Sequence, residues 1–217
     1  MIKVDLHTHS IASPDGSITT EQYKKILGDK TLDCIAITDH NSVDLALSLQ
    51  KELGSEKIII GEEISTTQGE IIGLFLKSKI EPNQDIKYTI EQIKQQGGIV
   101  YIPHPFETVR SGITKETLET IREDVDIIES ANGRAFFQNF GPQAHTWAHV
   151  RNVPTFASSD GHRPQALGKT YTLLNEVPAL ENLLDLVKGS RKFYSRPSML
   201  DILAPKLNRI KKFLKIL

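Results

Sequence analysis

Short apolar runs alternate with longer segments of helical period along most of this chain. Seven of the runs are expected to form strands. Strands that alternate with helices pair in parallel through helical crossovers, and seven is close to the number that closes a barrel. We therefore expect an α/β fold, with strands at residues 2–6, 34–38, 57–64, 70–77, 99–103, 125–130 and 153–159.

The intervening segments predict helices, and several of their ends carry local signals. Thr19 and Gln22 have the spacing of a capping box. Gly54 follows the second helical segment, and Gly97 follows the third. The expected helices span residues 19–27, 43–53, 86–96, 115–123, 143–151 and 180–188. Because no repeat or linker interrupts this pattern, we expect one barrel domain over 1–188 and a C-terminal segment over 189–217.

The length and composition fit a globular domain. The chain has 217 residues, of which 39% are hydrophobic and 24% charged, so disorder is not expected. It lacks the run of about 18 apolar residues that a membrane span needs, and its N-terminus lacks the pattern of a signal peptide. A single cysteine, Cys34, excludes an internal disulfide and is expected to be a small buried side chain. We therefore predict a cytoplasmic protein.

Histidines and acids cluster directly after the expected strands. The C-terminal ends of parallel strands share one face of an α/β fold, and that face carries the chemistry. A single histidine at such a position would usually be a hydrogen-bonded loop or core residue. Several histidines at equivalent positions instead indicate one shared site. Five of the seven histidines and four acids fall at this face: His7, His9, His40, His104, His162, Asp15, Asp39, Glu63 and Asp160.

This set of residue types indicates a metal centre. Neutral imidazoles and carboxylates are the ligands of divalent transition metals. In an extended strand, residues two apart point the same way, so His7 and His9 share a direction, as do Asp160 and His162. A structural site closes with about four ligands, whereas more are present here. We therefore expect two or three ions of Mn, Fe or Zn, in a cluster that activates water for displacement at phosphorus.

The motifs DLHTHS, SPDG, ITDHN, GEEIS, IPHP, NGR and SSDGHRPQALG together resemble the PHP (polymerase and histidinol phosphatase) superfamily. They follow one another from residue 5 to about residue 170. The resemblance implies a distorted (β/α)7 barrel of the TIM type with up to three metals. It places His7, His9, Glu63 and Asp160 on one metal. It places Glu63 and His104 on a second, and Asp15, His40 and His162 on a third.

One position departs from this family pattern. Many members carry a histidine shortly after the bridging glutamate, where this chain has Glu70 in GEIIGLF. Glu70 as an oxygen ligand would favour Mn or Fe over Zn. A solvated Glu70 would instead leave the second metal weakly held, and both alternatives stay open. Asp39 is expected to cap a turn or orient an imidazole rather than to bind metal.

The expected function is that of a metal-dependent phosphoesterase acting on a small phosphorylated substrate or a nucleotide. Asp160 and His9 would be indispensable for turnover. Arg134 and Arg163 would hold phosphate oxygens, although each is equally compatible with a surface ion pair. Two alternatives remain. The first is metal-assisted hydrolysis of a non-phosphate substrate, and the second is a metal-poor binding module that acts through the C-terminal segment.

Two further histidines, His145 and His149, have the i,i+4 spacing of a zinc-binding helix. The residue after His145 is Thr rather than the Glu of a zinc protease. A partly exposed helix is therefore the favoured interpretation.

The C-terminal segment is strongly basic. From residue 189 onward it carries eight bases and one acid, whereas the preceding residues carry 18 bases and 26 acids. Residues 205–217 predict an amphipathic helix, with Pro205 in its first turn. Its apolar face is expected to pack on the acidic barrel or on a second copy. Contact with an anionic membrane or with nucleic acid is the less favoured alternative.

Overall fold

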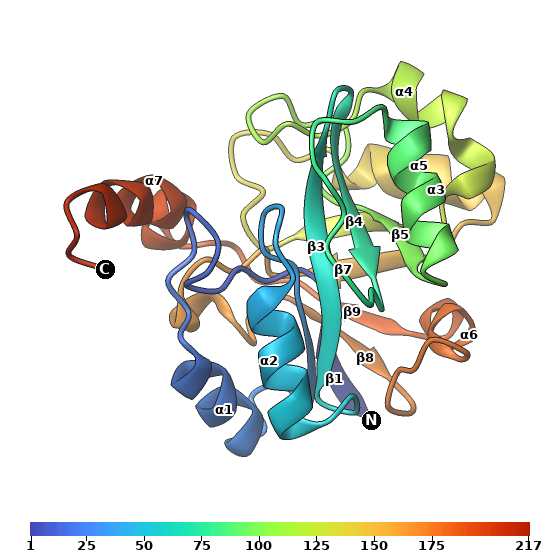
Figure 1. The fold of residues 1–217 in the computed structure, drawn as a ribbon. Helices are drawn as coiled ribbons and strands as arrows, with labels where there is room; N and C mark the ends of the chain where they lie inside the picture. The colour runs from blue at the N-terminus through green and yellow to red at the C-terminus, as the bar shows by residue number, and fades with distance from the viewer.

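Nine strands form one strongly curved sheet that nearly closes into a barrel (Figure 1). The computed structural model describes all 217 residues. The strands lie in the order β7-β6-β5-β4-β3-β2-β1-β8-β9, and the expected α/β barrel is confirmed. Their bounds are β1 Ile2–Asp5, β2 Cys34–Ile37, β3 Ile58–Thr66, β4 Gly69–Leu74, β5 Ile99–Ile102, β6 Ile127–Asn132, β7 Thr155–Ser158, β8 Tyr171–Leu174 and β9 Arg191–Phe193.

Six of the seven expected strands are parallel, as predicted: β1, β2, β3, β5, β6 and β7. The expectation of a parallel strand at residues 70–77 was wrong, because a two-residue turn rather than a helix joins β3 to β4. β4 runs antiparallel to both of its neighbours, so its first residues lie where the parallel strands end. We call that end of the barrel the mouth. Between β8 and β7, the Thr172 hydroxyl bonds the backbone N and O of Ala157 at 2.9 and 3.1 Å. Beyond β1, the backbone N of His9 donates to Gly161 O at 2.8 Å, which helps to close the barrel.

Seven α-helices accompany the sheet, and most begin and end near the expected residues. The second half of the expected helix 115–123 is instead a 3₁₀ turn at Arg122–Asp124. The helix expected from residue 180 begins at Leu183, because the Asn182 side chain bonds the backbone of Ala179 and Val177. The bounds are α1 Thr20–Gly28, α2 Asp44–Leu53, α3 Ile86–Gln95, α4 Lys115–Thr120, α5 Gly141–Arg151, α6 Leu183–Lys188 and α7 Met199–Phe213.

Two strands, β8 and β9, are absent from the sequence-based expectation. β9 has three residues, all exposed, so its sequence contains no apolar run from which a strand could be predicted. It pairs with β8, which pairs with β1. The expected division between residues 188 and 189 falls just before this strand and stays a prediction.

The two faces of the sheet carry separate apolar clusters. In β2, Ile35 and Ile37 pack in the larger cluster with buried residues of α2, whereas Cys34 and Ala36 pack in the smaller one. Leu183 and Val187 of α6 also belong to the smaller cluster. This split follows from the alternation of side chains along a strand. The burial of Cys34 confirms the interpretation of that residue.

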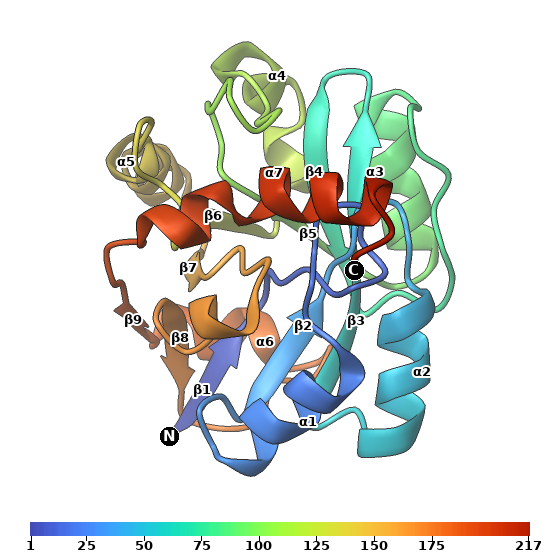
Figure 2. The same ribbon diagram turned by 90° about the vertical axis from the view of Figure 1, so that its left-hand side faces the viewer.

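α7 lies across the mouth of the barrel (Figure 2). It begins at Met199, because Ser198 and Asp201 form a capping box, and so Pro205 lies inside the helix rather than in its first turn. The structure contains no helix that is long and apolar enough to span a membrane.

The face that α7 turns toward the barrel is polar or small rather than apolar. Asp201, Ala204 and Asn208 are buried, and the Asn208 amide donates to Asp15 O and His162 O at 2.8 and 3.0 Å. Leu207 and Phe213 are 41% and 86% exposed. The expectation that the apolar face of this helix packs on the barrel was therefore wrong.

Candidate metal centre

The mouth brings together all nine side chains that were predicted to bind metal. Seven of them are buried, and His40 and Glu70 are partly exposed. Their ligand atoms form four overlapping groups, within each of which the atoms lie no more than 4.8 Å apart. The groups are His7, His9 and Glu63; His7, His104 and Asp160; His9, Asp15, His40 and His162; and His40, Glu63 and Glu70.

The backbone around the cluster is held in unusual conformations. His104 and Asp160 have positive φ angles of 27° and 50°, which non-glycine residues adopt only where the surrounding structure enforces them. The loop that carries Asp15 comes so close to the end of β1 that a Cβ on Gly16 would lie 2.0 Å from Ser10 O. These backbone conformations help to bring the side chains of Asp15, His104 and Asp160, which lie on separate loops, to the same end of the barrel.

Three ligand atoms, from His7, His9 and Glu63, have the spacing that one ion requires, and a fourth lies close to the two histidines. Atoms about 2.1 Å from an ion in tetrahedral geometry lie about 3.4 Å from one another. The Nε2 atoms of His7 and His9 are 3.1 Å apart, and Glu63 Oε2 lies 3.5 and 3.2 Å from them. Asp160 Oδ1 lies 3.7 and 3.5 Å from the same nitrogens. All four residues of the first predicted set are therefore neighbours, and their joint binding of one ion stays a prediction.

The Glu63 carboxylate faces two sets of histidines at once. Its Oε1 lies 2.9 Å from His104 Nε2, whereas its Oε2 faces His7, His9 and His40, with His40 Nδ1 at 3.2 Å. A carboxylate with its two oxygens directed apart in this way can bridge two ions. The geometry thus agrees with the bridging role that the family resemblance implies for Glu63.

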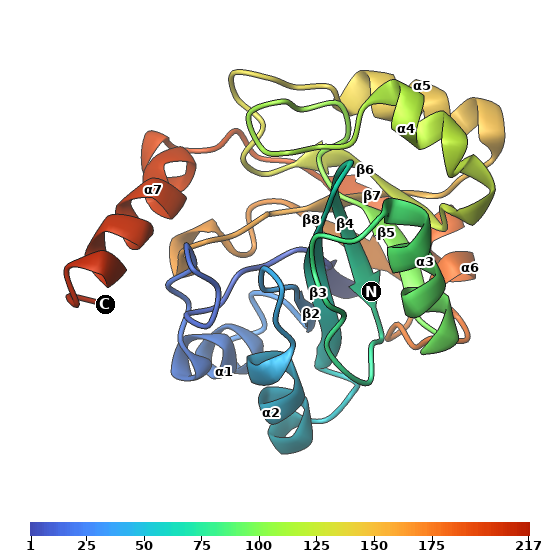
Figure 3. The same cartoon turned by 45° about the horizontal axis from the view of Figure 1, so that its top comes forward.

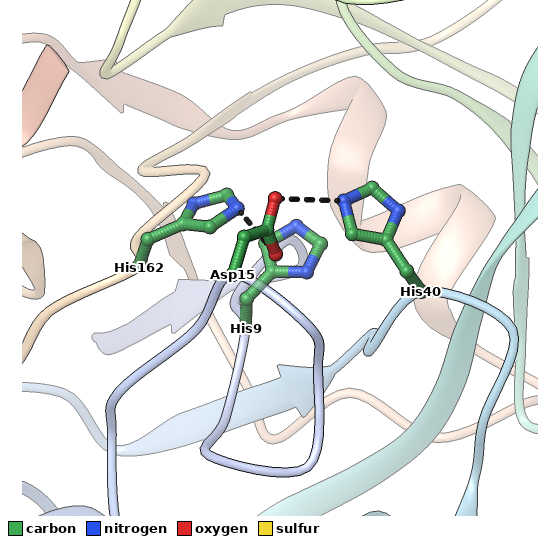
Figure 4. Close-up of side chains that lie close together, drawn as sticks. All are labelled: His9, Asp15, His40 and His162. Carbon is green, nitrogen blue, oxygen red and sulfur yellow. Dashed lines mark ion pairs between the residues drawn. The ribbon is translucent and has the colours of Figure 1, made fainter. Parts of the chain in front are cut away.

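Asp15 lies between two histidines from opposite sides of the mouth (Figure 4). Its Oδ2 is 3.5 Å from His40 Nε2, and its Oδ1 is 3.4 Å from His162 Nε2. Arg209 of α7 also approaches it, with Nη2 2.9 Å from Asp15 Oδ2. The third predicted set therefore exists as a group, and a cation of the C-terminal helix contacts it.

Glu70 faces the cluster rather than solvent. It begins β4, and its Oε1 lies 3.6 Å from His40 Nδ1. Burial, reinforced by the neighbouring Glu63 carboxylate, raises the pKa of Glu70 to about 8. Its position is that of a further oxygen ligand, which stays a prediction.

Glu129 of β6 contacts the candidate site but was not predicted from the sequence. Its Oε1 lies 3.2 Å from His7 Nδ1 and accepts the Tyr101 hydroxyl at 2.9 Å, while its Oε2 accepts the backbone N of His104 at 2.7 Å. A carboxylate on the far nitrogen of a histidine fixes the tautomer and orientation of a metal ligand. The available signal was an acid within the apolar strand VDIIES.

Asp39 behaves as predicted. Its two oxygens accept hydrogen bonds from the backbone N and the hydroxyl of Ser10, at 2.6 and 2.5 Å. It therefore caps the turn that follows the first two histidines and does not face the cluster.

The carboxylates control the protonation of the histidines. Burial opposes the charged form of His9, but hydrogen bonds to Asp160 and Glu63 outweigh it and raise its pKa to about 9. The pKa of His7 is also well above the usual value, because Asp160, Glu63 and Glu129 overcome its burial. Burial and the neighbouring His9 instead lower the pKa of His162 to about 3. Protonated His7 and His9 thus supply part of the positive charge that balances the buried carboxylates.

Of the two predicted arginines, only Arg134 reaches the mouth. Its Nη1 lies 3.2 Å from both oxygens of Asp160. Arg163 instead bonds Gln165 at 2.9 Å and lies near Asp201, outside the mouth, so the structure does not support its catalytic role. Arg110, which was not predicted, donates to Asp160 Oδ2 at 2.6 Å.

His145 and His149 lie on α5, where both are exposed and their ring centroids are 6.4 Å apart. Neither lines the pocket at the mouth. The interpretation as part of an exposed helix is confirmed.

A model of the PHP domain matches residues 5–193. This chain belongs to the PHP family. An uncharacterised protein of Methanocaldococcus jannaschii is 34% identical over 142 residues, which are 59% of this chain and 82% of that protein. The PHP match accounts for the order of the motifs as well as for the barrel.

Two solved structures share the fold. One is a two-domain Bacteroides vulgatus protein described as containing a predicted PHP-like metal-dependent phosphoesterase. It has a TM-score of 0.67 and 22% identity, over 96% of this chain and 69% of that one. The other is a lesion-specific endonuclease from Pyrococcus furiosus, with a TM-score of 0.62 and 17% identity, over 88% of this chain and 57% of that one.

Proposed function

We propose that this PHP protein is a metal-dependent phosphoesterase, with the cluster at the mouth as its active site. The spacing of the ligand atoms of His7, His9, Glu63 and Asp160 carries the proposal. Membership in the PHP family supports a metal-dependent hydrolase. The two proteins of similar fold, a predicted phosphoesterase and an endonuclease, both concern phosphate esters, which supports phosphorus as the reacting centre.

The residues at the mouth fit divalent ions. The buried Nε2 of His162 lacks any hydrogen-bond partner and lies 3.4 Å from Asp15 Oδ1. An unpaired buried nitrogen beside carboxylates is costly unless a ligand satisfies it. When bound, two or three ions of Mn, Fe or Zn would supply an activated water and neutralise charge at phosphorus.

The pocket at the mouth, called here the mouth pocket, has the size and charge for a phosphorylated molecule. Its volume of about 650 Å³ suits a ligand as large as a nucleotide. Four cations line it, Arg110 and Arg134 on the barrel and Lys206 and Arg209 on α7. The two barrel arginines adjoin Asp160, where they can hold phosphoryl oxygens. Asp15, Glu63, Glu70 and Asp160 line the same pocket, so its charges balance until divalent ions bind, and the bound ions would then favour an anionic ester over a neutral amide.

The test combines metal analysis with a screen for phosphate release from nucleotides and sugar phosphates in the presence of Mn. Wild-type protein should bind at least one ion per chain and release phosphate. His9→Ala and Asp160→Ala should lose the activity, whereas His145→Ala, a histidine outside the mouth, should retain it. Undiminished activity in both mouth variants, or a purified protein that takes up no metal, would overturn the proposal.

A further inference from the structure

Much of the exposed side of α7 is apolar. Leu200, Leu203, Leu207, Ile210 and Leu214 follow one another at helical spacing, and their exposed fractions lie between 41% and 58%. Met199, Phe213, Ile216 and Leu217 extend this surface, and Phe213 is 86% exposed. We call these nine side chains the apolar ridge. Single exposed hydrophobes are ordinary, but a contiguous set of this kind marks an interaction surface.

Polar bonds fix the opposite side of α7 to the barrel, so the ridge cannot turn inward without breaking them. Asn208 donates to two backbone carbonyls, and the Lys212 ammonium donates to the backbone oxygens of Ile11 and Ser13. Asp201 accepts from Lys169 at 2.9 Å. Most of the ridge is therefore exposed, although Ile210 borders the mouth pocket and Leu200, Leu207 and Leu217 border a second hollow between α7 and the barrel. Figure 2 shows the helix lying across the mouth.

Charge is distributed unevenly between α7 and the surface of the barrel. Eight of the 26 acids in residues 1–188 are buried, which leaves 18 acids against 18 bases. The acidic excess of the barrel thus belongs to its interior, and its surface is balanced. Residues 189–217 carry eight bases, and their one acid, Asp201, is buried. Lys206, Lys211 and Lys215 are exposed alongside the ridge.

We propose that α7 lies in the surface of an anionic lipid bilayer, with the apolar ridge inserted and the lysines at the level of the headgroups. A basic helix with one apolar face has this chemistry. A second copy of the chain would bring two basic helices face to face, which opposes pairing through the ridge. Nucleic acid would bind the lysines but leave the ridge exposed to water. Lipid is the one partner that satisfies both features.

A second apolar element lies at the rim of the same pocket. Val109 is 73% exposed and lines the mouth pocket together with Ile202 and Ile210 of α7. The loop that carries it lies on the same side of the barrel as α7 (Figure 3). Docking through α7 would therefore turn the mouth pocket toward the bilayer surface.

The experiment is sedimentation of the full-length protein with vesicles of phosphatidylcholine alone or of phosphatidylcholine mixed with phosphatidylglycerol. Wild-type protein should bind the mixed vesicles and dissociate at high salt. Each charge removed in Lys211→Gln and Lys215→Gln should weaken the partition about fivefold. Phe213→Ser and Leu207→Ser should also weaken it. Val150→Ser, at a 73% exposed position on α5, is the matched control and should bind as wild type.

Failure of wild-type protein to bind the mixed vesicles would overturn the proposal. Binding that resists both serine substitutions would also overturn it, because the ridge would then contribute nothing. A dimer in light scattering that Phe213→Ser converts to a monomer would assign the ridge to a second copy instead. Thermal unfolding of each variant shows whether it is folded, since side chains this exposed contribute little to stability.

Discussion

On the barrel side of the mouth pocket, other buried groups hold the candidate metal ligands in place, whereas the α7 side is lined mostly by exposed side chains of one docked helix. We call these two sides the barrel wall and the α7 wall. On the barrel side, His7 is fixed by Glu129 on its Nδ1 and faces the cluster with its Nε2. On the α7 side, Lys206 lines the pocket from an exposed position. Groups that must hold metal require this kind of support, while groups that attract an anionic substrate need only to be near it.

The largest effect is expected from Glu63, which belongs to more than one of the groups of candidate metal ligands. Glu63→Gln keeps the shape of the side chain but removes the charge that faces His7, His9, His40 and His104. Loss of a group that merely orients a ligand lowers affinity or activity about 10-fold to 100-fold, so loss of this ligand should exceed 100-fold. Metal content and kcat would be measured.

The neighbouring Glu62 provides a matched control for Glu63. It lies in the same strand but accepts a hydrogen bond from the backbone N of Ile80 at 2.8 Å, away from the cluster. Glu62→Gln can keep that bond and should retain metal. Equal losses in the two variants would mean that the strand, rather than the shared carboxylate, was disturbed.

A smaller effect is expected from Glu129, which contacts the nitrogen of His7 that points away from the cluster. Glu129→Gln should lower metal affinity or kcat about 10-fold to 100-fold, because His7 would lose the partner that sets its tautomer. Measurement of metal affinity separates this role from a purely structural one, provided that the variant unfolds at a temperature close to that of wild type. A variant with wild-type affinity would show that His7 is positioned by its other contacts.

The barrel wall should also respond to pH through His9. Its pKa is raised to about 9 without metal, and an ion binds only the neutral imidazole. Apparent metal affinity should therefore rise with pH up to about pH 9, by about tenfold per pH unit for each proton that His9 and the similarly shifted His7 release, and calorimetry in two buffers can count these protons. The same shift stabilises the metal-free fold below the unfolded pKa of about 6.5, and this stability is lost as the pH rises through 9. An affinity that levels off near pH 7 would contradict the shift.

The barrel wall was largely predictable from the sequence, whereas the α7 wall was not. His7, His9 and Asp160 stand directly after apolar strands, and parallel strands bring their ends together whatever their order along the sheet. Glu129 was missed because its partner His7 is 122 residues away in the chain. Arg110 was missed because a loop arginine has no pattern that distinguishes it from a surface residue.

The apolar ridge shows a different limit of prediction. The periodicity of residues 205–217 correctly indicated an amphipathic helix, but periodicity does not say which face meets the barrel. The orientation of α7 depends on hydrogen bonds from Lys212 to the backbone oxygens of Ile11 and Ser13. Such bonds cannot be predicted from the pattern of side chains, because every residue has a backbone oxygen. Pro205 was placed in a first turn because the true start of α7 depends on Ser198, outside the segment that was considered.

The smallest effect is expected at the α7 wall. Lys206→Gln should raise KM for a phosphate ester by no more than about fivefold and leave kcat unchanged, because an exposed ion pair contributes up to about 1 kcal/mol. Lys211→Gln is the matched control, since it removes the same charge from the same helix at a position that does not line the mouth pocket. If both variants raise KM equally, α7 acts through its overall charge. A fall in kcat for Lys206→Gln alone would instead place that side chain at the reacting phosphate and remove the distinction between the two walls.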